Sequence, residues 1–292
     1  MTGFEDSTGY TRLEVAFGSS GPSDGWLPYA EAVLSATRIE DVWHSHCQKM
    51  AEYGFDRMIY GANQFRNYGA FGDPSDWLIL TNHDRDYVKQ FFGNLLYNDA
   101  PMTVWVAQNT GVCSWQWAID RRARGESSQK ENMIHDFNER MGVVAGYSIS
   151  FEHNSPRSKS GIGLCARRCL TQADVEEIWA DKGREIVAYN RLMNLKVSSL
   201  PFARNTSTLT ARQREVLQWV ADGKTVQDIA TILGLTPATV EKHLRLAREN
   251  LDAETTAQAV MKASLQNQLF VVEGVSSEDI QRSGQLMAKQ II

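Results

Sequence analysis

Residues 209–251 read LTARQREVLQWVADGKTVQDIATILGLTPATVEKHLRLARENL, and this stretch predicts a compact block of three short helices. The capping box Thr210-x-x-Gln213 opens the first helix, because its two side chains satisfy backbone N–H groups that a helix start leaves unpaired. Gly223 ends this helix, and Thr225 has the hydroxyl needed to cap the next one. The block therefore begins with two helices joined by a tight turn.

The third helix of the block follows another glycine. Gly234 permits a sharp turn, Thr236 is the predicted N-cap, and Pro237 stands at the first helical position, where its fixed φ is favourable. The apolar side chains of this helix recur along one stripe, formed by Val240, Leu244, Ala247 and Leu251. Two short helices, a glycine turn and a third helix with a solvated, cationic face are typical of a helix-turn-helix.

The solvated face of the third helix carries side chains suited to double-stranded DNA. Lysine and arginine reach guanine O6 and N7 or phosphates, while threonine and histidine are able to contact base edges or phosphates. The candidate DNA-binding residues are Thr225, Thr236, Thr239, Lys242, His243, Arg245 and Arg248. Residues 209–268 hold seven Lys or Arg and seven Asp or Glu, a balance that predicts modest nonspecific affinity and favours binding as a dimer.

This block resembles the C-terminal DNA-binding domain of LuxR-type transcriptional regulators. The resemblance rests on L-T-x-R-x-x-E-V-L, the following G-K-T, I-A-x-I-L-G and T-V-E-K-H, and it covers about a fifth of the chain. Gln213 stands where the family usually has glutamate, and glutamine still closes the capping box. Asn250 stands where the family usually has lysine, and the loss of this cation predicts weaker DNA affinity. The segment 255–269 resembles the family's fourth helix, which pairs DNA-binding domains across a dimer.

Length and composition set the limits for the rest of the chain. Its 292 residues suffice for two domains, and 42% apolar residues exclude a disordered protein. The net charge of −5 gives no overall basic field, so DNA contact must be local. Four cysteines do not make a disulfide scaffold, and no apolar run reaches about 18 residues. We expect no secretory leader, because residues 1–14 have neither a basic n-region nor an apolar h-region. We expect a cytoplasmic protein with reduced thiols and no membrane contact.

Catalysis and metal binding are not expected. No convergent set of acid, base and nucleophile is present, so an enzyme is not indicated. Cys165-x-x-x-Cys169 lacks a second pair at the spacing of metal ligands, and we expect neither a metal nor a cofactor.

The upstream part of the chain mixes helical and strand patterns. Helices are expected at 27–53, 85–96, 101–109, 127–141 and 171–194, and strands at 55–63, 77–81, 115–118, 143–151 and 160–166. The fold class is α+β: an N-terminal α/β/α sandwich, followed by an all-α four-helix domain with the helix-turn-helix. We expect a flexible arm at 1–26, a sensory domain at 27–196, a linker at 197–208, the helix-turn-helix domain at 209–270 and a helical extension at 271–292.

The upstream region resembles, more weakly, the autoinducer-binding domain of quorum-sensing LuxR-type receptors. The traces are TNHDRDYVKQFF at 81–92, DAPMTVW at 99–105, GVCSW at 111–115 and GVVAG at 142–146. The resemblance implies an apolar cavity that holds an N-acyl-homoserine lactone or a similar small apolar signal molecule. The candidate ligand-binding residues are Tyr60, His83, Tyr87, Phe91, Asp99, Trp105, Trp115, Ser148 and Gly163.

The resemblance is incomplete at the ligand's polar head. The family's lactone-binding tryptophan falls on Tyr87, a pocket tyrosine falls on Phe91, and the aspartate expected before Pro101 is Ala100, with Asp99 one residue early. Trp115 matches a second pocket tryptophan, but a late-strand hydroxyl falls near Gly163, leaving Tyr60 and Ser148 as candidate substitutes. The loss of two of three anchors predicts a roughly ten- to a thousandfold weaker affinity for a lactone.

Two functions follow from these patterns. The first is a homodimeric transcriptional regulator in which a ligand bound to the sandwich favours binding to a pseudo-palindromic operator. The second is a ligand-independent protein, its cavity filled by its own aromatic side chains, that forms heterodimers with a related regulator and acts as an anti-activator.

Overall fold

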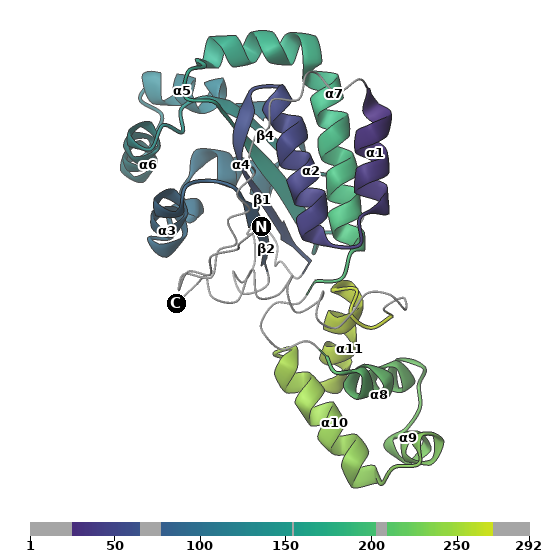
Figure 1. The fold of residues 1–292 in the computed structure, drawn as a ribbon. Coiled ribbons are helices and arrows are strands. Elements are labelled where there is room, and N and C mark those ends of the chain that lie inside the picture. The colour runs from purple at the N-terminus through teal and green to yellow at the C-terminus, as the bar shows by residue number, and fades with distance from the viewer. Residues whose placement is uncertain (1–24, 65–76, 154, 203–208, 271–292) are drawn as a thin grey trace. The chain divides into compact units, whose positions relative to one another are not determined.

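The computed structural model describes residues 25–64, 77–153, 155–202 and 209–270. The chain forms two compact units that divide between Ser198 and Ser199 (Figure 1). Outside the described residues lie all but the last two residues of the expected arm at 1–26, part of the expected linker, and the expected extension at 271–292.

A five-stranded antiparallel sheet forms the centre of the first unit, with the strand order β2-β1-β5-β4-β3. The strands are β1 (Phe55–Asn63), β2 (Trp77–Thr81), β3 (Gly111–Ser114), β4 (Gly146–Ser150) and β5 (Lys159–Ala166). In the register, Gly163 pairs with Ile59 on one side and Ser148 on the other. Because side chains alternate along a strand, Ile59 and Gly61 share one face of β1 and Tyr60 takes the other.

Helices cover both faces of this sheet, as Figure 1 shows, so the predicted α/β/α sandwich is confirmed. One layer contains α1 (Trp26–Ser35), α2 (Ile39–Glu52) and the long α7 (Gln172–Ser199). The other contains α3 (Arg85–Gly93), η2 (Leu96–Asn98), α4 (Pro101–Gln108), α5 (Gln116–Ala123) and α6 (Gln129–Arg140). None of the helices among the described residues is long and apolar enough to cross a membrane.

Three local expectations are corrected. The helical segment 27–53 is two helices, because Ala36 has extended backbone and ends α1. The strand expected at 115–118 is wrong: Trp115 donates its backbone N–H to the Gly146 carbonyl, and its own carbonyl then accepts from Ala118 in the first turn of α5. The last helix of the unit, α7, continues to Ser199, so the start of the expected linker is helical.

The second unit contains the predicted four helices: α8 (Ala211–Ala221), α9 (Val226–Leu233), α10 (Pro237–Asn250) and α11 (Thr256–Leu265). Thr210 and Gln213 make both bonds of the capping box, and Gly234 adopts a left-handed φ of 64° between α9 and α10. The apolar stripe of α10 packs in a core with residues of α8, α9 and α11, namely Val216, Leu217, Ile229, Ala259 and Ala263. This packing leaves the polar faces of α10 in solvent.

Candidate functional site

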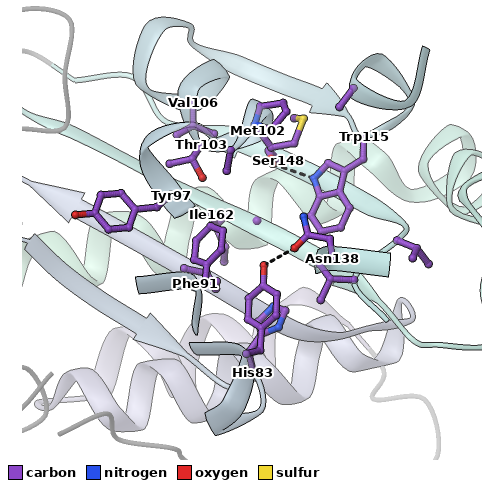
Figure 2. Close-up of a pocket in the computed structure, with 18 of the residues that line it drawn as sticks. His83, Phe91, Tyr97, Met102, Thr103, Val106, Trp115, Asn138, Ser148 and Ile162 are labelled. Carbon is purple, nitrogen blue, oxygen red and sulfur yellow. Dashed lines mark hydrogen bonds between the residues drawn. The ribbon is translucent and has the colours of Figure 1, made fainter. Parts of the chain in front are cut away.

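A cavity of about 590 Å³ lies between the sheet and the helical layer that contains α3, α4, α5 and α6 (Figure 2). Its wall is mainly apolar and aromatic, which is typical of a small-molecule site. The residues labelled in Figure 2 are His83, Phe91, Tyr97, Met102, Thr103, Val106, Trp115, Asn138, Ser148 and Ile162. Six of the predicted ligand-binding residues line it: His83, Tyr87, Phe91, Trp115, Ser148 and Gly163.

Stacked rings form the α3 wall of the cavity. Tyr87 and Phe91 are one helical turn apart, and their ring centroids lie 5.4 Å from each other with nearly parallel planes. The His83 ring also stacks on Tyr87, with centroids 4.6 Å apart, and the ring of Phe137 of α6 lies 5.3 Å from Tyr87. Burial, together with the positive charge of Arg57, lowers the pKa of His83 to about 3, so its imidazole is neutral at neutral pH.

Two aromatic donors in the wall are already paired within the protein. The Tyr87 hydroxyl donates to Asn138 Oδ1 at 3.1 Å, and Trp115 Nε1 donates to Ser148 Oγ at 3.0 Å; Figure 2 marks both bonds. Burial raises the pKa of Tyr87, which keeps its hydroxyl protonated as a donor. The Tyr87–Asn138 and Trp115–Ser148 pairs are therefore formed by the protein's own side chains.

Glycines of the sheet form part of the cavity floor. A Cβ at Gly163 would lie 3.9 Å from Trp115 Cζ2, and one at Gly61 would lie 3.5 Å from Ile79 Cδ1, both ordinary van der Waals distances. A Cβ at Gly161 would instead overlap Val106 of α4. Space over Gly163 therefore belongs to the cavity, while α4 closes the space over Gly161.

Three predicted ligand-binding residues lie outside the cavity lining. Tyr60 is buried on the other face of β1, where its hydroxyl donates to Asn194 Oδ1 of α7 at 2.9 Å. Asp99 pairs with Lys130 at 3.1 Å on the surface, while Ala100 lines the cavity. Trp105 is half-buried on α4 and does not line the cavity, although its neighbour Val106 does.

Asn138 is a lining residue that the sequence reasoning missed. It lies on α6 in the stripe of Ile134, Phe137 and Met141, which pack in the aromatic cluster around Tyr87. One sequence signal could have identified it. Asn138 follows Ile134 by four residues and Phe137 by one, so it lies beside the apolar stripe of the helix, where a polar side chain needs a partner.

The predicted DNA-binding residues lie on α10 and at the start of α9. Thr225 and Thr236 are exposed N-caps whose hydroxyls accept from the backbone N–H groups of Asp228 and Thr239. Lys242 and Arg245 are exposed, and Arg245 forms an ion pair with Glu249 at 2.5 Å. The other candidates on this helix, Thr239, His243 and Arg248, are partly buried.

The two positions that depart from the LuxR-type pattern contact each other. Asn250 Nδ2, at the end of α10, donates at 3.0 Å to Gln213 Oε1, which also accepts from the Thr210 backbone N–H in the capping box of α8. Asn250 thus faces the start of α8, where two neutral amides join the helices.

No metal centre is present among the residues that the structure describes. Cys165 is buried in the aromatic cluster, and burial raises the pKa of its thiol to about 12. Cys169 is exposed at the cavity rim. Neither thiol is placed as a ligand of a metal in this part of the chain.

Comparison with known proteins finds two family models. The autoinducer binding domain matches residues 38–197, and the bacterial regulatory proteins of the luxR family match residues 207–263. The chain is 28% identical over 221 residues to the HTH-type quorum sensing-dependent transcriptional regulator RpaR of Rhodopseudomonas palustris, covering 73% of this chain and 82% of that protein. It is 37% identical to the transcriptional activator protein LuxR of Aliivibrio fischeri, covering 65% and 74%.

Solved structures give a weaker likeness. The N-acylhomoserine lactone dependent LuxR family factor CepR2 of Burkholderia cenocepacia aligns at 15% identity and a TM-score of 0.47, covering 59% of this chain and 92% of that chain. Escherichia coli SdiA aligns at 15% identity and a TM-score of 0.44, covering 85% and 100%.

Proposed function

Since this chain belongs to the LuxR family of quorum-sensing transcriptional regulators, we propose that its first unit binds an N-acyl-homoserine lactone or a similar apolar signal. We further propose that the liganded chain binds a pseudo-palindromic operator as a homodimer. The family itself is one of transcription factors with an autoinducer-binding domain and a DNA-binding helix-turn-helix, not of enzymes. The ligand, the operator and the dimer are the parts that need experiment.

The observation that carries the ligand proposal is the cavity of about 590 Å³ inside the aromatic cluster. The side chains of Tyr87, Phe91 and Trp115 line this space and do not fill it, which supports a receptor over a ligand-independent protein. Burial of an acyl chain there would contribute about 0.8 kcal/mol per methylene. A long hydrocarbon tail therefore compensates for weak contacts at the polar head.

Six predicted residues remain in the proposed ligand site. They are His83, Tyr87, Phe91, Trp115, Ser148 and Gly163. Phe91 and Ala100 bring no hydrogen-bonding group into the cavity, so the head group has fewer polar contacts than the family pattern implies. Tyr60, Asp99 and Trp105 are left out of the proposed site, because other contacts or positions hold them outside the lining.

The proposed DNA surface is the polar face of α10 with the exposed cap of α9. Lys242 and Arg245 are the exposed cations of α10, so DNA can reach both. The Arg245–Glu249 ion pair must open before the Arg245 guanidinium binds a base or a phosphate. Two such helices in a dimer would contact half-sites about one DNA turn apart. The exposed threonines Thr225 and Thr236 would position the protein on the phosphates.

A gel-shift titration of the full chain tests this proposal, with N-octanoyl-homoserine lactone present or absent. We expect the wild type to retain duplex DNA at low salt, more tightly with the lactone, and Lys242→Ala/Arg245→Ala to lose most of this binding. Failure of the wild type to retain any duplex, with or without lactone, would overturn the DNA proposal. A stable heterodimer with a related regulator that cannot hold DNA would support the anti-activator function instead.

A further inference from the structure

Asn138 has the geometry of a ligand-binding side chain with a fixed orientation. It lines the cavity from α6, and its Oδ1 accepts the hydroxyl proton of Tyr87 at 3.1 Å. This bond places Oδ1 toward Tyr87 and turns Nδ2 away from that hydroxyl. Among the described residues, this is the hydrogen bond that the Asn138 side chain makes, so the two hydrogens on Nδ2 remain for a ligand.

The surroundings of Asn138 make that donor selective. Phe137 and Val143 are buried in the same aromatic cluster, and Asn138 beside Phe137 is itself partly buried. In a site of this kind a hydrogen bond is stronger than in water, and an unpaired donor against an apolar ligand is costly. A ligand with an acceptor oxygen at this place is therefore favoured over one with hydrocarbon or an N–H group.

A second pair, between Trp115 at the start of α5 and Ser148 of β4, has the same arrangement. Trp115 Nε1 donates to Ser148 Oγ, so the serine oxygen is an acceptor within the wall and its own hydrogen is free to turn toward the cavity (Figure 2). In both pairs an aromatic donor fixes a smaller polar side chain, which then presents hydrogen to the cavity. Asn138 and Ser148 together could donate hydrogen bonds to a head group that has more than one acceptor oxygen.

We propose that Asn138 donates a hydrogen bond to a ring ester oxygen of the ligand's head group, and that Tyr87 is its positioning residue. This inference rests on the proposed function, because it assumes that an acyl ligand with a cyclic ester occupies the cavity. It adds a head-group contact on α6, a helix from which sequence reasoning selected no ligand-binding residue.

The test compares two ligands that differ only at the head group. N-octanoyl-homoserine lactone has ring ester oxygens, and N-cyclopentyl-octanamide replaces that ring with hydrocarbon of the same size. Isothermal titration of the full-length wild type should show about fivefold tighter binding of the lactone, the effect of one neutral hydrogen bond. In Asn138→Leu the preference for the lactone should fall by about fivefold, while binding of the amide changes by less than about twofold.

Two further variants separate binding from folding. Asn132→Leu makes the same replacement on α6 at a residue outside the cavity lining and should leave both affinities unchanged. Tyr87→Phe removes only the positioning hydroxyl, and it should lower the lactone preference while the ring stack with Phe91 stays. Because the preference is a ratio measured on one protein sample, partial misfolding of a variant does not change it.

The outcomes distinguish the two proposals. If the wild type binds neither compound, the proposed function fails, and the Asn138 assignment fails with it. If the wild type prefers the lactone and Asn138→Leu keeps the same preference, the Asn138 assignment alone is overturned. Loss of the preference in Asn138→Leu and its retention in Asn132→Leu would support the donor contact.

Discussion

Gly146→Ala and Gly163→Ala form a matched pair that tests the floor of the cavity. Both glycines lie in the sheet, Gly146 at the start of β4 and Gly163 in β5. A Cβ at Gly146 would overlap the Leu164 carbonyl oxygen and lie 3.1 Å from Trp115 Cε2. A Cβ at Gly163 would find nothing closer than Trp115 Cζ2 at 3.9 Å.

The cost of Gly146→Ala follows from what must move. The Gly146 carbonyl accepts from the Trp115 backbone N–H at 3.1 Å, and its own N–H donates to Gln172 Oε1 at 2.9 Å. Relief of the overlap separates β4 from β5 and lengthens these bonds, each of which contributes about 1 kcal/mol. With an overpacking cost of 1–3 kcal/mol, the free energy of unfolding should fall by about 3–5 kcal/mol.

Gly163→Ala should change the same free energy by less than about 1 kcal/mol, because the methyl makes an ordinary contact and also restricts the unfolded chain. The measurement is urea unfolding followed by far-ultraviolet circular dichroism, with both variants compared at equal m-value. The methyl at 163 does enter the cavity, so lactone affinity should fall although stability does not. Equal stability of the two variants would refute this account of the sheet.

Three further predictions concern charge. Asp99→Asn should leave lactone affinity unchanged in titration calorimetry, because Asp99 pairs with Lys130 outside the cavity; a tenfold loss would contradict this. Lys242→Ala should reduce the slope of log affinity against log salt by about 0.9 in gel shifts, as expected for one phosphate contact. Burial lowers the pKa values of His46 to about 4 and of His83 to about 3, so the folded state binds fewer protons than the unfolded state below pH 6.5. Stability should be full above that pH and fall as acid approaches pH 4, by about 3 kcal/mol for His46 alone, and urea unfolding at a series of pH values measures it.

Much of the fold was predictable because local signals and burial agree. The strands 55–63 and 77–81 match β1 and β2 at both ends, since apolar and β-branched residues there are bounded by turn-forming residues. The helix-turn-helix was predictable for the same reason, with each cap at its expected residue. The prediction of a strand at 115–118 was wrong, because the apolar side chains of this segment are compatible with a strand or with the start of a helix. The hydrogen bond from the Trp115 backbone N–H to the Gly146 carbonyl shows that the sheet ladder ends there.

The site was less predictable, because it depends on which face of an element meets the cavity. The side chains of Tyr60 and Ile59 point to opposite faces of the sheet, and Ile59 lines the cavity while Tyr60 does not. The sequence of β1 alone does not indicate which of these faces meets the cavity. The Gln213–Asn250 contact joins residues 37 positions apart, so the sequence did not show that these two departures from the family pattern meet. Their amides join α8 and α10 through a neutral hydrogen bond.

The cavity separates the source of ligand affinity from the source of ligand selectivity. Tyr87 and Trp115 have their donors satisfied by Asn138 and Ser148, so the fold needs no ligand to pair these buried groups. Two added methylenes, at about 0.8 kcal/mol each, outweigh one neutral hydrogen bond of about 1 kcal/mol, so hydrocarbon length should dominate affinity. The spare hydrogens of Asn138 and Ser148 then decide which head group is accepted, because a head group without matching oxygens leaves them unpaired in an apolar wall.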